Sequence, residues 1–198
     1  MSRIRIFIGL GSNMGDRVAT LRSAVMRIDN GAIADTVLTN CSHLVETRPM
    51  GPAKYPFLNA VIEVAASVDP SIVLAGCLAL EREHGRVRTA HWGPRALDLD
   101  LLFGITDAGP IFQKTPQLRL PHPGLQQRDF VLAPLAELAP DLRIGDKTSL
   151  EWLAALPDTQ RTILRKHPEH LLPRARFSGR FSRTKRGDQR ASTPSPGG

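Results

Sequence analysis

Two aspartates that follow a group of arginines are the residues of this chain best suited to chemistry. They lie in the segment GRVRTAHWGPRALDLDLLFG, from 85 to 104. Side chains alternate between the two faces of an extended segment, so we expect Asp98 and Asp100 to point the same way, about 7 Å apart. Two such carboxylates could hold Mg²⁺ on a polyphosphate, because Mg²⁺ accepts one or two carboxylates together with phosphate oxygens. The remaining phosphate charge could be bound by the preceding arginines, Arg86, Arg88 and Arg95. The pattern indicates metal-assisted phosphoryl transfer.

The same pattern has a structural alternative, an edge strand whose aspartates are solvated beside a solvated basic loop. Two observations favour the metal site. The aspartates interrupt a run that is otherwise apolar from 96 to 103, and burying unpaired carboxylates there would be costly. A bound cation would remove that cost.

The segments around this site alternate between strand and helix patterns. Apolar runs and β-forming residues predict strands over 5–10, 36–47, 57–66 and 98–103. A first helix is predicted from Leu21, Val25 and Ile28, which recur on one helical face, and a second begins after the N-cap Asp69 and ends at Gly85. The order βαββαβ is that of a ferredoxin-like α+β domain. A C-terminal extension would follow, with a strand or hairpin over 111–120 and helices over 130–138 and 149–156.

Three glycines follow the first strand: Gly9, Gly11 and Gly15. Their spacing is GxGxxxG, whereas a dinucleotide-binding Rossmann loop has GxGxxG and an acid at the end of the next strand; here Asp29 and Asp35 precede that strand. No GxxxxGK[ST] occurs, which excludes a P-loop, so phosphate must be held by side chains and metal. We expect a tight turn with Asn13 in a left-handed conformation.

The segment from 85 to 104 resembles the central signature of the hydroxymethyldihydropterin pyrophosphokinase family, enzymes of the folate pathway. Four further blocks are similar to that family in the same order: FIGLGSNMGDR, ETRPMGP, FLNAVIEV and LRLPHPGLQQRDFVLAPLAELAP. Together the blocks cover roughly residues 4–157. The resemblance implies transfer of diphosphate from ATP to the hydroxymethyl group of 6-hydroxymethyl-7,8-dihydropterin, with release of AMP and with two Mg²⁺ ions on Asp98 and Asp100.

The resemblance also assigns roles to residues on the ATP side. His122 and Arg128 would contact the phosphates, and Arg88 would provide either a third phosphate contact or a nucleotide-loop contact. Charge in the transition state would be stabilised by Arg86 and Arg95. Glu81 would be an acid near the metal, although a solvated helix residue would fit its position too. Trp92 would cover the substrates, and His91 stands where the family often has arginine, so its phosphate contact would be weaker and pH-dependent.

A pterin is a flat heteroaromatic ring with an edge of donors and acceptors, so its site needs aromatic faces and an amide. By the resemblance, Phe57 and Phe130 sandwich the ring and Asn59 binds its edge. Residues of the preceding loop complete the pterin-binding region: Thr47, Pro49, Met50 and Gly51. The glutamine that is common in this loop is absent from residues 48–56. Without the family motif, both phenylalanines would be read as core residues.

Charge is distributed unevenly along the 198 residues, whose net charge is +7. Ten Lys and Arg stand against two acids from residue 161 onward, which leaves 16 basic and 17 acidic residues before it. We therefore predict a pyrophosphokinase domain over 1–160, a C-terminal extension over 161–173, and a basic, disordered tail over 174–198, which is too polar to offset the entropy of ordering.

The two cysteines, Cys41 and Cys77, form no CxxC pair, and the N-terminus shows neither a signal-peptide pattern nor a run of 18 apolar residues. We expect a cytoplasmic monomer with free thiols and without a membrane or nucleic-acid partner. Two rival functions stay open. The protein could bind nucleic acid through its basic tail, or it could be another Mg-dependent nucleotidyl- or phosphotransferase on the same fold.

Overall fold

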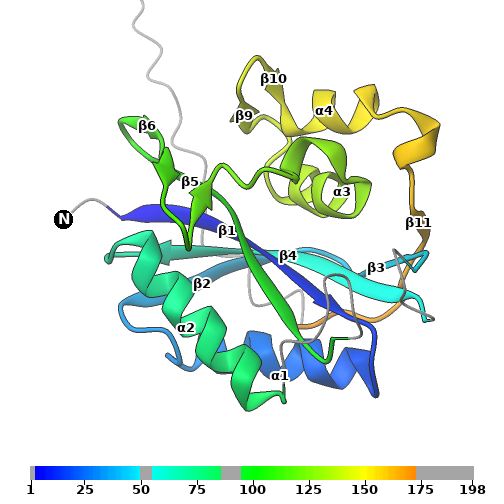
Figure 1. The fold of residues 1–198 in the computed structure, drawn as a ribbon, viewed down its shortest axis with the longest axis horizontal. Coiled ribbons are helices and arrows are strands. Elements are labelled where there is room, and N and C mark those ends of the chain that lie inside the picture. The colour runs from blue at the N-terminus through cyan, green and yellow to red at the C-terminus, as the bar shows by residue number, and fades with distance from the viewer. Residues whose placement is uncertain (1–2, 50–54, 86–94, 173–198) are drawn as a thin grey trace, which may run out of the picture.

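The computed structural model describes residues 3–49, 55–85 and 95–172 (Figure 1). The predicted tail over 174–198 lies outside these residues. Within them the fold is α+β, with an antiparallel sheet of seven strands between helices on both faces. Over the same residues, no helix is both long and apolar enough to cross a membrane.

The sheet is built around β1 (Ile4–Ser12), which lies between β4 (Phe57–Ala66) and β5 (Asp98–Thr106). The outer strands are β2 (Thr36–Cys41) and β3 (Val45–Thr47), which both pair with β4, followed by β11 (Ile163–Lys166) beside β3 and β6 (Gly109–Pro110) beside β5. Every strand pair is antiparallel. This order brings the N-terminal half of β5 next to the C-terminal half of β1.

One strand had been predicted over 36–47, but the structure divides it into β2 and β3. Ser42 lies at the break, where its N–H donates to Val61 O (2.9 Å) and its hydroxyl oxygen accepts from Val61 N (2.9 Å). The Ser42 hydroxyl thereby takes the place of a backbone carbonyl in the pairing with β4. A run of β-forming residues in the sequence does not show such a replacement.

Helices α1 (Arg17–Asp29) and α2 (Pro70–Glu83) cover one face of the sheet, the lower face in Figure 1. The predicted face of α1 is confirmed, since Leu21, Val25 and Ile28 are fully buried. The predicted ends of α2 are confirmed as well: Asp69 accepts from Ser71 N (2.8 Å), and Gly85 follows the helix with φ of 77°. These helices pack on the inward side chains of β1, β4 and β5 to form the larger core.

Helices α3 (Asp129–Leu138) and α4 (Ser149–Ala155) lie on the opposite face and agree with the predicted helices within one residue at each end. Two short hairpins accompany them: β7 (Gln113–Lys114) with β8 (Arg119–Leu120), inside the segment predicted as a strand or hairpin, and β9 (Arg143–Ile144) with β10 (Lys147–Thr148). A second core lies between α3 and the sheet, with Phe7, Phe103 and Leu132 buried in it. At the other end of this face lies a pocket.

A β-bulge interrupts the pairing of β1 with β5. Phe7 is aligned with Phe103 and Ile8 with Leu101, so Leu102 is an extra residue on β5. Leu102 O accepts from His122 N (2.8 Å). The bulge therefore fixes where the segment after β8 joins the sheet.

The C-terminal segment packs on the domain, although no strand had been predicted there. β11 adds to the edge of the sheet beside β3, and His167 N donates to Leu44 O (2.9 Å). Leu171 and Leu172 belong to the larger core. Residues 161–172 are therefore an integral layer of the fold.

Candidate active site

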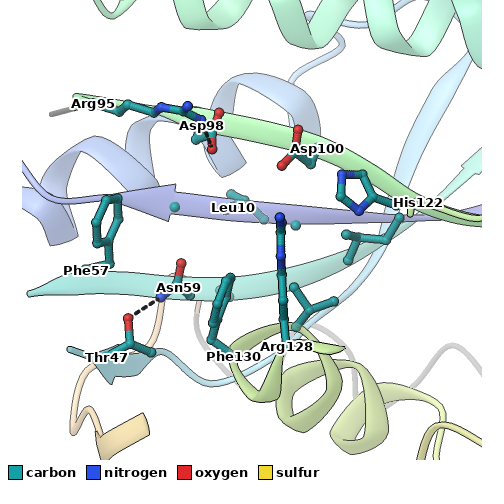
Figure 2. A pocket seen from close by; sticks show the side chains of 15 residues that line it. Leu10, Thr47, Phe57, Asn59, Arg95, Asp98, Asp100, His122, Arg128 and Phe130 are labelled. Atoms are coloured by element: carbon teal, nitrogen blue, oxygen red, sulfur yellow. Dashed lines mark hydrogen bonds and ion pairs between the residues drawn. The ribbon is translucent and has the colours of Figure 1, made fainter. Parts of the chain in front are cut away.

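A cavity of about 230 Å³ opens on the face of the sheet that α3 leaves uncovered. β1, β4 and β5 form its floor, while α3 and the segment before it form a wall (Figure 2). Many of the predicted site residues line it: Thr47, Phe57, Asn59, Arg95, Asp98, Asp100, His122, Arg128 and Phe130. Residues far apart in sequence thus meet in one pocket, as the family resemblance implies.

Glycines on β1 shape the floor of the pocket. Gly9 and Gly11 line it, and a Cβ atom built on Gly11 would lie 3.2 Å from Asn59 Oδ1. In the pairing of β1 with β5, Gly11 is aligned with Asp98 and Gly9 with Asp100. Because the aligned residues are glycines, β1 places no side chain opposite either carboxylate.

The predicted shared face of Asp98 and Asp100 is confirmed. Both line the pocket, whereas Leu99, between them, is 2% exposed and packs into the core under α1 and α2. Arg95 Nη1 donates to Asp98 Oδ2 at 2.6 Å (Figure 2). The Arg95 guanidinium and the two carboxylates therefore lie at one end of the pocket.

Asn13 holds Arg95 in place, a role that the sequence did not indicate. Its Oδ1 accepts from Arg95 N (2.7 Å), and its N–H donates to Arg95 O (3.1 Å). The predicted left-handed conformation of Asn13 is wrong, because the positive φ in this turn belongs to Gly15 (58°). Asn13 therefore connects the residue after β1 to the segment just before β5 through one side-chain and one backbone hydrogen bond.

Glu81 is neither a solvated helix residue nor part of the pocket lining. It is 2% exposed on α2, and its Oε1 accepts from Leu99 N (2.8 Å). The ATP-side role near the metal that the resemblance assigns to Glu81 stays a prediction, because the contact that the structure shows is with the backbone of β5. Glu81 instead binds the backbone of β5 between the two aspartates, because the buried side of α2 faces that strand.

His122 lies beside the carboxylates, held by the β-bulge. Its Nδ1 accepts from Gly124 N (3.0 Å), so in the neutral ring the proton is on Nε2. Burial lowers the pKa of His122 below its ordinary 6.5, and nearby Arg128 lowers it further, while Asp100 and Asp98 oppose the shift. A neutral imidazole at this place can donate a hydrogen bond without carrying charge.

Arg128 and Phe130 come from the start of α3. The Arg128 Cζ atom lies 5.9 Å from the centre of the Phe130 ring, within range of a cation–π interaction. A Cβ atom on Gly124 would lie 2.7 Å from the same Cζ, so glycine is needed for this approach. The arginine is thereby packed between a backbone and an aromatic ring.

The remaining wall of the pocket combines aromatic and amide groups. Phe57 and Asn59 project from β4, and Asn59 Nδ2 donates to Thr47 Oγ1 (3.0 Å), which orients the amide (Figure 2). Pro49, predicted with this group, is exposed and does not line the pocket. Other predicted positions lie outside the described residues: Met50, Gly51, Arg86, Arg88, His91 and Trp92.

Residues 7–140 match the family model described as 7,8-dihydro-6-hydroxymethylpterin-pyrophosphokinase (HPPK). The chain belongs to the HPPK family. This confirms the resemblance drawn from the sequence blocks. The 2-amino-4-hydroxy-6-hydroxymethyldihydropteridine pyrophosphokinase of Pseudomonas aeruginosa is 40% identical over 155 residues, 77% of this chain and 92% of that protein. The Bacillus subtilis protein of the same name is 42% identical over 134 residues, 67% of this chain and 76% of that one.

The fold of this HPPK-family chain also resembles a solved structure described as "Crystal Structure Analysis of the HPPK-DHPS in complex with substrates". The TM-score is 0.58 at 11% sequence identity, and the match covers 78% of this chain. It covers 43% of the solved chain, so the protein spans less than half of that length. At this identity the likeness concerns the fold alone.

HPPK membership implies a divalent cation, and the donors in the pocket suit one. Mg²⁺ and similar hard cations prefer carboxylate oxygens and fill their remaining positions with phosphate and water. Asp98 and Asp100 supply such oxygens on one face. Across residues 3–49, 55–85 and 95–172, no group of three or more His, Cys, Asp or Glu could hold a metal.

Proposed function

We propose that this chain transfers diphosphate from ATP to the hydroxymethyl group of 6-hydroxymethyl-7,8-dihydropterin, releasing AMP, as a step of folate biosynthesis. The observation that carries the proposal is that one pocket holds both kinds of group the reaction needs. Arginines, a histidine and two carboxylates suit a metal-bound polyphosphate. Two phenylalanines and an oriented amide suit a flat heterocycle.

In this reaction the substrate hydroxyl is the nucleophile. Its oxygen forms a bond to the β-phosphorus of ATP, the bond from that phosphorus to the oxygen of the α-phosphate breaks, and the hydroxyl proton is lost. AMP leaves with the electron pair of the broken bond. No covalent intermediate on the protein is needed, so the residues act by positioning the substrates and by stabilising charge.

The charged residues of the pocket have separate parts in this proposal. Arg95, held by Asn13, stabilises charge that develops on the transferred group, while Arg128 and the Nε2–H of His122 bind phosphate oxygens. Asp98 and Asp100 would hold two Mg²⁺ ions, which would neutralise phosphate charge when bound. Arg86, Arg88 and Trp92 keep the ATP-side roles that the family resemblance implies.

The apolar half of the pocket binds the pterin in this proposal. Phe57 and Phe130 stack on the two faces of the ring, and Asn59 binds its edge with the amide that Thr47 orients. Pro49, Met50 and Gly51 belong to the same binding segment on the strength of the family motif. Stacking is present before and during the reaction, so changes to Phe57 or Phe130 should raise KM for the pterin more than they lower kcat.

We also propose that the sheet is the ferredoxin-like βαββαβ arrangement, supported by the order β2–β4–β1–β5 with antiparallel neighbours. We propose a pyrophosphokinase domain over 1–160 that the extension over 161–173 completes, with β11 as an edge strand of the sheet. We propose a cytoplasmic monomer; the cytoplasmic location is supported by the two cysteines, which are free thiols.

The proposed function is tested by the nucleotide that is released. The protein is incubated with Mg·ATP and 6-hydroxymethyl-7,8-dihydropterin, and the nucleotides are separated by chromatography. AMP should form only when the pterin is present. The matched control is a 6-methyl pterin, which binds similarly but has no hydroxyl to attack phosphorus. Formation of ADP, or of AMP without the hydroxymethyl group, would contradict the proposal and favour another transferase on this fold.

The basic tail should be dispensable for this reaction. Its charge lies beyond the described domain, and charges separated by more than about 8 Å are largely screened at physiological ionic strength. Truncation after Pro173 should leave kcat/KM for ATP within about tenfold of the full chain at physiological salt. A larger loss, or failure to fold, would assign the tail a part in the domain.

A further inference from the structure

Asp129 is a buried acid next to the pocket but not in its lining. It is 2% exposed and stands between Arg128 and Phe130, which both line the pocket. Its carboxylate accepts three hydrogen bonds from the start of β11: from Thr162 N (2.5 Å) and Ile163 N (2.8 Å) to Oδ2, and from Thr162 Oγ1 (2.6 Å) to Oδ1. The first turn of α3 is thereby tied to the C-terminal segment.

The same short segment is bonded on its other side to β3. Thr162 O accepts from Arg48 N (2.9 Å), and Arg48 Nη2 donates to Arg161 O (2.8 Å). Ile163 is aligned with Thr47 in the pairing of β11 with β3. Thr162 therefore binds α3 through its N–H and hydroxyl, and through its carbonyl it binds Arg48, the residue that follows β3.

These bonds form a continuous path between two walls of the pocket. The path runs from Phe130 through its neighbour Asp129 to Thr162, then through Arg48 to its neighbour Thr47, which accepts from Asn59. The path begins and ends at groups that line the pocket: the Phe130 ring at one end and the hydrogen-bonded Thr47–Asn59 pair at the other. Both belong to the proposed pterin half. The carboxylate pair on β5 lies outside this path. Thr162 also lies outside residues 7–140, where the family model matches.

We infer that Asp129 is a positioning residue for the pterin half of the pocket, acting through Thr162 to fix the distance between Phe130 and the Thr47–Asn59 pair. The inference rests on the proposed function. Loss of the carboxylate removes the acceptor for three donors and lets the two walls separate. A displacement of about 1 Å of groups that orient a substrate can cost up to about 10²-fold in rate or affinity.

Hydrogen bonding, rather than charge, is what this role requires. Both N–H groups bind Oδ2, and only a hydroxyl binds Oδ1. An asparagine can place its oxygen at the Oδ2 position and its amide nitrogen at the Oδ1 position, where the Thr162 hydroxyl can turn to accept. Asp129→Asn should therefore keep the connection that Asp129→Ala loses.

The experiment compares Asp129→Ala, Asp129→Asn and the control Asp69→Ala in the full chain. Asp69 also accepts backbone and hydroxyl hydrogen bonds at a helix start, but on α2, under the opposite face of the sheet. Steady-state kinetics give KM for the pterin and for ATP, and hydrogen exchange gives the protection of the Arg48 amide in the ligand-free protein. Asp129→Ala should raise KM for the pterin about tenfold or more and KM for ATP less than about threefold, with faster exchange at Arg48.

Rescue and control decide the outcome. Asp129→Asn should stay close to the wild type in both measurements, and Asp69→Ala should lose stability without a change in KM for the pterin. The inference is overturned if Asp129→Ala matches Asp69→Ala in both KM and Arg48 exchange. If the wild-type chain neither binds nor converts the pterin, the proposed function fails. The rate of hydrogen exchange at the Arg48 amide in Asp129→Ala then decides by itself whether Asp129 fixes the wall that contains Thr47 and Asn59.

Discussion

Replacing Asn13 with alanine tests whether the geometry around Arg95 sets the rate. Asn13 is 3% exposed and makes its side-chain contact to Arg95 N at 2.7 Å. Loss of the acceptor leaves a partly buried N–H unsatisfied, which costs about 1–3 kcal/mol of unfolding free energy. Arg95 Nη1 reaches Asp98 Oδ2 over 2.6 Å, so a backbone shift of about 1 Å breaks that contact. We expect kcat to fall about 10- to 100-fold with little change in KM for the pterin.

Urea unfolding and steady-state kinetics measure the two effects separately. The matched control is Asn40→Ala, because Asn40 Oδ1 also accepts a backbone hydrogen bond, from Cys41 N (3.0 Å), but on β2 and away from the pocket. The control should lose stability and keep kcat. If Asn13→Ala is destabilised as expected but turns over normally, then Arg95 either keeps its place without Asn13 or does not stabilise the transition state.

The pocket and the buried thiol of Cys77 give three further predictions. Asp98→Ala or Asp100→Ala should lower Mg-dependent turnover by at least about 10²-fold without unfolding the protein; normal turnover in both would contradict the metal assignment. Because burial lowers the pKa of His122, the unfolded state binds the proton of this residue more readily than the folded state does. The free energy of unfolding should therefore drop as pH falls through about 6.5. Urea unfolding of His122→Asn should show a smaller drop over the same pH range. Burial raises the pKa of Cys77 to about 12, and its side chain is fully buried, so it should not react with a thiol reagent until the chain unfolds; labelling of Cys77 in the native protein would refute this.

Local patterns in the sequence were sufficient for the parts of the site that lie on regular elements. The alternation of acids and leucines over 98–101 predicted that Asp98 and Asp100 share a face, since strand geometry leaves no other choice. The sequence Asp69-Pro70 predicted the start of α2 by the same kind of local rule. In both cases the determining contacts are within a few residues.

The residues that the sequence missed all act on distant partners. Asn13 was assigned a turn conformation because asparagine tolerates it, but its partner Arg95 is 82 residues away. The sequence does not decide whether Glu81 is a solvated helix residue or an acid near the metal, because no local pattern shows that its carboxylate accepts from Leu99 N. The strand β11 forms because the edge of β3 is open to pairing, and a short segment such as 163–166 carries no sufficient signal of its own.

The extra residue at the β-bulge makes the site depend on how many residues β5 contains. A shift of one residue in strand pairing moves every side chain to the opposite face, and Leu102 absorbs one such shift between Phe103 and Asp100. Removal of that residue would let the ladder run on without interruption, with Asp100 still aligned with Gly9 and Phe103 with Phe7, but His122 would lose the carbonyl that anchors it. Deletion of Leu102 should thus lower activity through the lost anchor of His122 while the sheet and its two faces are kept, so the count of residues in β5 sets the place of a side chain that β5 does not itself contain.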